Sequence, residues 1–161
     1  MRRIGMYRIF VCAISILIAW ILSIIPLPFE EHWARPEWMS LVLIYWMMNE
    51  PGLVGVGTAF SVGLVMDGLR GGLLGENALA MTVVAYLTHL LRYRLRLHSF
   101  WIRTLCILVL VGFGQLTILC TRWGVGNPPQ TLLVWLSTLT SVLLWPFVFR
   151  LIQFYGRKTI D

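Results

Sequence analysis

Residues 38–66 read WMSLVLIYWMMNEPGLVGVGTAFSVGLVM, and they decide the fold because they form either one membrane span or two. A single helix of this length would extend about 43 Å, which exceeds the roughly 30 Å of hydrocarbon in a bilayer. Glu50-Pro51-Gly52 also interrupts it, because proline breaks the helical hydrogen bonds and a carboxylate is costly in lipid. We therefore predict two short spans, 38–49 and 51–66, or a re-entrant pair joined by a tight turn.

The rest of the chain has the composition of a membrane protein. Of its 161 residues, 58% are hydrophobic and 12% are charged, about half of the charged share of a typical soluble domain. The uncharged runs are 9–29, 38–49, 51–66, 77–91, 104–121 and 123–149, of which the first and the last two are long enough to cross a bilayer. We predict an all-α polytopic membrane protein, with residues 1–161 forming one integral membrane domain.

The distribution of positive charge favours six spans over five, because cytoplasmic loops are rich in Lys and Arg. With six spans and a cytoplasmic N-terminus, Arg35, Arg70 and Arg122 lie outside. Ten positive residues are then cytoplasmic: Arg2, Arg3, Arg8, Arg92, Arg94, Arg96, Arg103, Arg150, Arg157 and Lys158. Five spans give only eight against five. We therefore expect both termini in the cytoplasm, and we attribute the net charge of +6 to topology rather than to nucleic-acid binding.

Small residues recur at every fourth position along and beyond the third predicted span. The series is Gly55, Ala59, Gly63, Asp67, Gly71 and Gly75. On one continuous helix these residues would share a slowly drifting face, and small residues on such a face allow another helix to approach closely. The series therefore predicts either a helix–helix contact within the protein or a docking surface for a partner. Gly71-Gly72 is more typical of a helix end than of its continuation.

Asp67 lies on this face near the outer end of the third span, where an ionisable side chain is a candidate functional residue. Three interpretations remain open: an interfacial ion pair with Arg70, a cap that orients the loop that follows, or a contact with a partner or ligand. The sequence offers no second membrane-embedded carboxylate for a paired acid–base site.

Two further segments have an expected structural role. Arg35-Pro36-Glu37-Trp38 marks the entry into the second span, and Trp145-Pro146 predicts a kink in the last span. The arginines near residues 92–103 are explained by topology, although they also suit a cytoplasmic partner or anionic lipid. We find no motif for a nucleophile, a metal site or a cofactor, so we expect no catalytic residues, no metal and no cofactor.

Several of these pieces together resemble the MreD family of rod shape-determining proteins over nearly the whole chain. They are Arg35-Pro36-x-Trp38, Tyr45-Trp46, Val56-Gly57-Thr58, the series from Gly63 through Asp67 and Gly71 to Gly75, Leu79-Ala80-Met81, and Leu144-Trp145-Pro146. Each piece alone is weak, but their order and spacing together are fairly specific.

The resemblance implies a non-enzymatic scaffold of the bacterial inner membrane that serves cell-wall elongation. Such proteins bind MreC, and through it they connect to MreB, to the RodA glycosyltransferase and to a class B penicillin-binding transpeptidase. The resemblance also implies a fold related to the S components of energy-coupling-factor transporters. That relationship supports a second hypothesis, a small-molecule- or lipid-binding membrane protein, although Asn49, Asn77, Gln115 and Thr117 are the few polar candidates besides Asp67.

Overall fold

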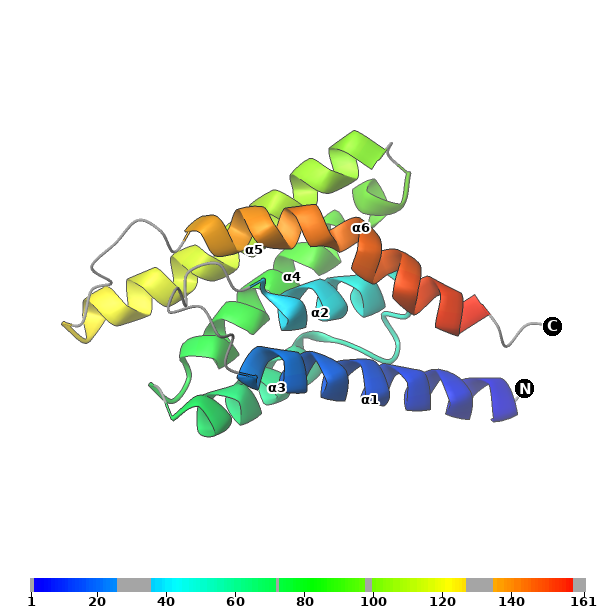
Figure 1. Cartoon of the computed structure of the whole chain (residues 1–161), viewed down its shortest axis with the longest axis horizontal. Helices are drawn as coiled ribbons and strands as arrows, with labels where there is room; N and C mark the ends of the chain where they lie inside the picture. The colour runs from blue at the N-terminus through cyan, green and yellow to red at the C-terminus, as the bar shows by residue number, and fades with distance from the viewer. Residues whose placement is uncertain (1, 26–35, 72, 98–99, 127–134, 158–161) are drawn as a thin grey trace.

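The computed structural model describes residues 2–25, 36–71, 73–97, 100–126 and 135–157, and this part of the chain is all-α (Figure 1). Its elements are α1 (Arg2–Ile24), α2 (Trp38–Asn49), α3 (Val56–Arg70), α4 (Glu76–Leu97), α5 (Phe100–Gly124) and α6 (Trp135–Arg157). The predicted division of residues 38–66 into two helices is confirmed, because α2 ends at Asn49 and α3 begins at Val56. The segment between the two helices contains Pro51 and Gly52, as the sequence predicts.

The six helices alternate in direction, so the start of α1 and the end of α6 lie at the same end of the bundle (Figure 1). We call this the termini end; the α2–α3 and α4–α5 connections also lie there. The far end carries the start of α2, the α3–α4 connection and the end of α5. An even number of antiparallel helices is the arrangement that the charge count requires.

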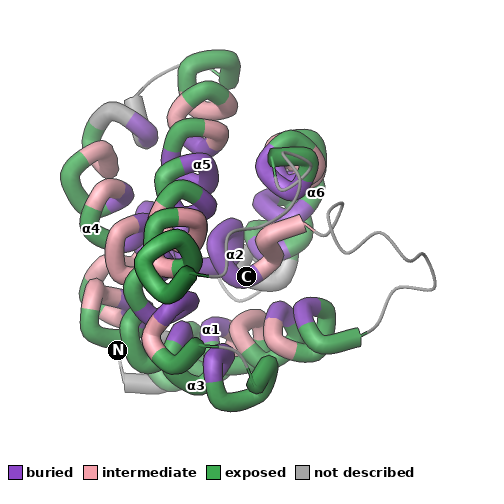
Figure 2. The backbone as a smooth tube through the Cα atoms, turned by 90° about the vertical axis from the view of Figure 1, so that its left-hand side faces the viewer, coloured by how far each residue is buried: buried purple, intermediate pink, exposed green. Residues whose placement is uncertain are grey.

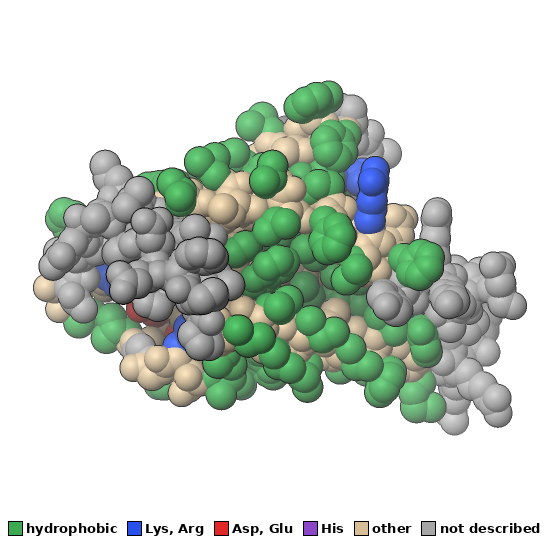
Figure 3. Space-filling view, in the orientation of Figure 1, with side chains coloured by type: hydrophobic (Ala, Val, Ile, Leu, Met, Phe, Trp, Pro, Cys, Tyr) green, Lys and Arg blue, Asp and Glu red, His purple; other side chains and the backbone are tan. Residues whose placement is uncertain are grey.

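Three helices are long and apolar enough to cross a membrane: Met6–Ile24, Phe100–Gly124 and Trp135–Phe154. Their outward faces expose large hydrophobic side chains such as Phe10 and Leu143, and Figure 3 shows hydrophobic side chains over much of one face. In water such a surface would be unstable, whereas lipid tails cover it at no cost. The protein is therefore a membrane protein.

Helix α2 is the centre of the bundle. Each of its residues from Met39 to Met48 is buried, and it packs against α1, α4 and α6 (Figure 2). Its 12 residues extend only about 18 Å, well short of the hydrocarbon core. Because the other helices surround α2, its length does not have to match the bilayer.

An acidic residue flanks each end of α2. At the termini end, the Arg8 guanidinium of α1 donates a hydrogen bond to the Glu50 carboxylate. At the far end, Glu37 precedes the helix and contacts α5 and α6. A cation on a neighbouring helix therefore binds the Glu50 carboxylate at the break between α2 and α3.

Helices α3 and α4 cross in very close contact at Gly63. A Cβ atom added to Gly63 would lie 2.6 Å from the Ala78 Cα atom and 2.7 Å from the Asn77 carbonyl oxygen. Both neighbours are backbone atoms of α4, so no side-chain rotation can relieve the clash. Glycine at this position therefore sets the distance between the two helices.

Candidate functional site

Asp67 of α3 binds the first turn of α4. Its Oδ1 atom accepts hydrogen bonds from the Asn77 backbone N–H at 2.9 Å and from Asn77 Nδ2 at 2.8 Å. Its Oδ2 atom accepts from the N–H groups of Gly75 at 2.9 Å and Ala78 at 3.2 Å. The side chain is 1% exposed. The carboxylate thus satisfies N–H groups that a helix start leaves unpaired, at the positive end of the helix dipole.

These contacts favour the second of the three interpretations of Asp67. It caps the helix that follows and forms no ion pair with Arg70, and a contact with a partner or ligand stays a prediction. The Arg70 side chain instead donates to the Asn77 Oδ1 atom at a long 3.4 Å. Both residues therefore converge on Asn77 without binding each other. The physical reason is that Asp67 faces α4, whereas Arg70 is exposed in the last turn of α3.

A second contact joins α4 to α5. The Arg122 Nε atom lies 2.6 Å from the Glu76 Oε1 atom. The Glu76 side chain is 6% exposed, and that of Arg122 is 45% exposed. Glu76 is the first residue of α4 and Arg122 lies in the last turn of α5, so this ion pair joins the two helices at the far end.

A third contact joins α2, α5 and α6. The Gln115 Nε2 atom donates to the Glu37 Oε1 atom at 2.9 Å and also lies 3.3 Å from the Ser137 Oγ atom. The Glu37 backbone N–H donates to the Ser141 Oγ atom at 2.7 Å. Because Gln115 and Ser141 are buried, this contact replaces water at the start of α2.

Burial raises the pKa of the Glu37 carboxyl group above its ordinary value. The positive charge of Arg70 and the hydrogen bond from Gln115 act in the opposite direction and do not cancel the effect of burial. Glu37 precedes the first residue of α2 and so lies outside the spanning helix.

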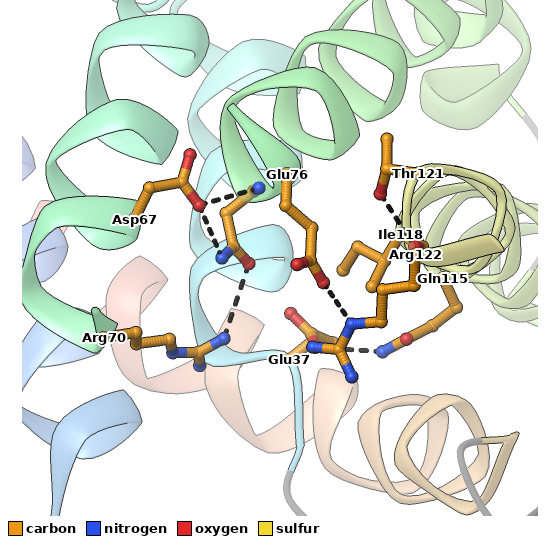
Figure 4. A network of polar contacts seen from close by, with 9 residues as sticks. Glu37, Asp67, Arg70, Glu76, Gln115, Ile118, Thr121 and Arg122 are labelled. Atoms are coloured by element: carbon orange, nitrogen blue, oxygen red, sulfur yellow. Dashed lines mark hydrogen bonds and ion pairs between the residues drawn. The ribbon is translucent and has the colours of Figure 1, made fainter. Parts of the chain in front are cut away.

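The three contacts together form one assembly, which we call the far-end polar network. Its members are Glu37, Asp67, Arg70, Glu76, Asn77, Gln115, Arg122, Ser137 and Ser141. Helix α5 takes part in the second contact through Arg122 and in the third through Gln115. These two residues are seven positions apart and therefore lie two turns apart on one face of α5 (Figure 4). The network connects five helices and holds three carboxylates against two guanidinium groups.

The predicted glycine series divides between two roles. Ala59 and Gly63 are buried and face the interior, like Asp67. Gly71 ends α3 with a left-handed φ of 62°, as predicted, and Gly75 has a positive φ of 99° in the turn that follows. Gly55 precedes α3, where its N–H donates to the Thr58 hydroxyl at 2.8 Å. The series therefore shares one helical face only as far as Asp67, because the helix ends at Gly71, as the sequence indicates.

The remaining predicted residues lie away from the network or outside it. Arg35 lies outside the described residues. The Pro36 carbonyl accepts from the Trp38 N–H at 2.9 Å where α2 begins, and the role of this segment in span entry stays a prediction. Pro146 lies inside α6, as predicted, and the buried Trp145 donates from Nε1 to the Thr104 hydroxyl of α5 at 3.2 Å.

Sequence reasoning missed Glu37, Glu76, Arg122, Ser137 and Ser141 as site residues. Glu37 and Gln115 are separated by 78 positions, so no local pattern connects them. A usable signal was the position of charges at predicted span ends, since Glu37, Glu76 and Arg122 each border an apolar run.

Six helices, long apolar faces and a buried polar network at one end define a polytopic integral membrane protein. Residues 1–155 match the family model of the rod shape-determining protein MreD. The chain is 31% identical over 142 residues to the rod shape-determining protein MreD of Haemophilus influenzae, covering 88% of each chain. The chain therefore belongs to the MreD family, as the motifs predicted, and this family determines rod shape. No solved structure matches the chain significantly.

Proposed function

We propose that this chain is a membrane scaffold subunit of the bacterial cell-wall elongation machinery. It lies in the inner membrane with both termini in the cytoplasm, acts without catalysis, and binds MreC. Through MreC it connects indirectly to MreB, RodA and a class B penicillin-binding transpeptidase. The observation that supports this proposal most is the exposed face of α3. One face of this helix packs on α4, and the opposite face is exposed.

The exposed face of α3 has the spacing of a helix-docking surface. Gly57, Ser61, Leu64 and Gly68 follow one another at intervals of four, three and four residues, and all are exposed. A Cβ atom added to Gly57 or Gly68 would meet nothing within 4 Å. Three of these four residues are small, and small residues on one helix face suit the close approach of a second transmembrane helix. This face, which we call the outer α3 face, is opposite to the face of Ala59 and Gly63 that α4 covers.

The test is Ser61→Leu, which puts a large side chain on the outer α3 face without disturbing the α3–α4 contact. Co-purification of MreC with the variant should fall at least about tenfold, because a lost close contact of about 1.4 kcal/mol has that effect. The matched control is Ala13→Leu, which enlarges an exposed small residue on the lipid-facing side of α1. Equal co-purification of MreC with both stably expressed variants would refute this interface.

One observation favours the alternative of a small-molecule- or lipid-binding protein. The Thr138 hydroxyl is buried, and within the described part of the chain it has no hydrogen-bond partner. Buried polar groups usually have a partner, so a bound molecule would satisfy it. Mass spectrometry of the purified protein after organic extraction should then identify a stoichiometric compound, and its absence would count against this alternative.

A further inference from the structure

The termini end carries arginines that no described carboxylate binds. Arg92 of α4 and Arg103 of α5 are partly buried, whereas Arg150 of α6 is exposed. Among the described residues, ion pairs join only Arg8 to Glu50 and Arg122 to Glu76. We call Arg92, Arg103 and Arg150 the basic collar. Within the described part of the chain, no carboxylate neutralises these three positive charges.

Arg150 is the most informative member, because it lies within an apolar helix that faces lipid. On the same helix, Phe147, Leu151 and Phe154 are all exposed. The apolar stretch Trp135–Phe154, which is long enough to cross a membrane, contains Arg150, and the Arg150 side chain is exposed among these hydrophobic residues. A charged side chain there is stable only where it reaches the headgroup level and finds a counter-ion.

Arg92 and Arg103 lie on either side of the α4–α5 connection. The Arg103 Nε atom donates to the Leu95 carbonyl oxygen at 3.1 Å, which leaves the two terminal nitrogen atoms of its guanidinium for another acceptor. Tyr93 and Trp101 lie next to the collar in sequence and are 77% and 78% exposed. Exposed Tyr and Trp side chains beside arginine are typical of the headgroup region. In Figure 3 a basic side chain borders the hydrophobic surface toward the termini end.

An aromatic contact joins α5 and α6 close in sequence to two collar residues. The Phe100 and Trp145 rings lie 5.3 Å apart, and Trp145 also contacts Phe149 at 5.0 Å. Arg103 follows Phe100 by one turn, and Arg150 directly follows Phe149. The aromatic contact therefore holds α5 and α6 together between the two arginines.

We propose that the basic collar binds the phosphate groups of anionic phospholipids in the leaflet on the termini side. Guanidinium groups match phosphate in charge and geometry, and exposed hydrophobic side chains beside them receive the acyl chains. An acidic protein segment would match the charge but not the lipid-facing position of Arg150. The proposal does not depend on MreC binding.

Native mass spectrometry of the full chain in detergent tests this proposal with phosphatidylglycerol and phosphatidylcholine at equal concentrations. Phosphatidylglycerol should be retained about tenfold better, consistent with the attraction of anionic lipid to each arginine. Inorganic phosphate at the same concentration should not displace it, because phosphate lacks acyl chains.

The test variant is Arg92→Gln/Arg150→Gln at the termini end, and the control variant is Arg70→Gln at the far end. The first should lose most of the preference for phosphatidylglycerol, and the second should keep it. Arg92→Lys/Arg150→Lys preserves charge and should keep at least half, which separates charge from folding. Equal retention of both lipids by the unaltered protein would overturn the proposal, and so would an equal loss of the phosphatidylglycerol preference in both glutamine variants. Either result would favour an acidic protein as the group that binds these arginines.

Discussion

Gly63 and Asp67 hold the α3–α4 pair from one face of α3, one helical turn apart. Gly63 lets the α4 backbone approach, and Asp67 binds the N–H groups of Asn77 and Ala78 in the same turn of α4. One neighbouring helix therefore explains the spacing of the two residues. The two contacts differ in kind, since one is steric and the other is polar, and each predicts a distinct outcome on substitution.

Gly63→Ala should lower the free energy of unfolding by about 1–3 kcal/mol, because the added methyl group overpacks the α4 backbone. The matched control is Gly68→Ala on the exposed face of α3, where a Cβ atom meets nothing within 4 Å. That change should be neutral or stabilise the protein by up to about 1 kcal/mol. Thermal denaturation in detergent, followed by tryptophan fluorescence, measures both, and equal shifts would contradict the close contact.

Asp67→Asn should lower the free energy of unfolding by at least about 2 kcal/mol, because the amide group faces N–H donors that need acceptors. Arg70→Gln distinguishes capping from an ion pair. If Asp67 acted through Arg70, both changes would cost a similar amount. Since the two do not bind each other, Arg70→Gln should cost less than about 1 kcal/mol in the same denaturation experiment.

At the scale of the element, α2 combines a short length with complete burial. A helix that is hydrophobic all round belongs inside a bundle, where every face finds apolar neighbours. At one end Glu37 contacts Gln115 inside the bundle, and at the other end the partly exposed Glu50 contacts Arg8. Arg8 and Gln115 provide the compensating contacts, so α2 is held at both ends by side chains from other helices.

The raised pKa of Glu37 predicts a pH dependence of stability. The folded protein favours the protonated form of Glu37, and this preference adds to the free energy of unfolding. The contribution is fully present below the ordinary carboxyl pKa of about 4.3 and is lost as pH rises through the pKa of Glu37 in the folded protein. Unfolding free energy should fall across that window by up to about 1.4 kcal/mol per pH unit. Glu37→Gln should make the profile of unfolding free energy against pH flatter, whereas the control Ser61→Ala should retain the slope. Coincident profiles for Glu37→Gln and the unaltered protein would exclude this role of Glu37.

At the scale of the whole molecule, the two ends of the bundle are chemically different. The far end neutralises its charges internally, through Asp67 at a helix start and through the Glu76–Arg122 pair. The termini end leaves Arg92 and Arg150 without a described ion-pair partner. This asymmetry matches the expected orientation, in which positively charged ends remain in the cytoplasm.

Cysteine labelling tests that orientation directly, in a background in which Cys12, Cys106 and Cys120 are replaced by serine. Leu74→Cys lies in the exposed α3–α4 connection, and Gly52→Cys in the exposed α2–α3 connection. A membrane-impermeant maleimide added to spheroplasts should label Leu74→Cys and spare Gly52→Cys. Inverted membrane vesicles should reverse the pattern, and labelling of both positions from one side would refute the alternating arrangement.

The sequence by itself determined the number of helices and the break between α2 and α3. The length of an apolar run and the positions of proline, glycine and charged residues act locally. Residues 38–66 therefore indicate two helices without reference to the rest of the chain. The sequence also indicated Asp67 and Gly63 as members of one face. It left open whether that face meets α4 or a partner.

Only the tertiary structure decided which groups the polar side chains meet. Asp67 binds Asn77 rather than Arg70, and Glu37 meets Gln115 from 78 positions away, because helix rotation and packing bring these side chains together. The rotation of each helix and its packing depend on the neighbouring helices and not on the local sequence alone. A local pattern of residues therefore specifies where the helices begin and end, whereas the far-end polar network exists only when α2, α3, α4, α5 and α6 are packed.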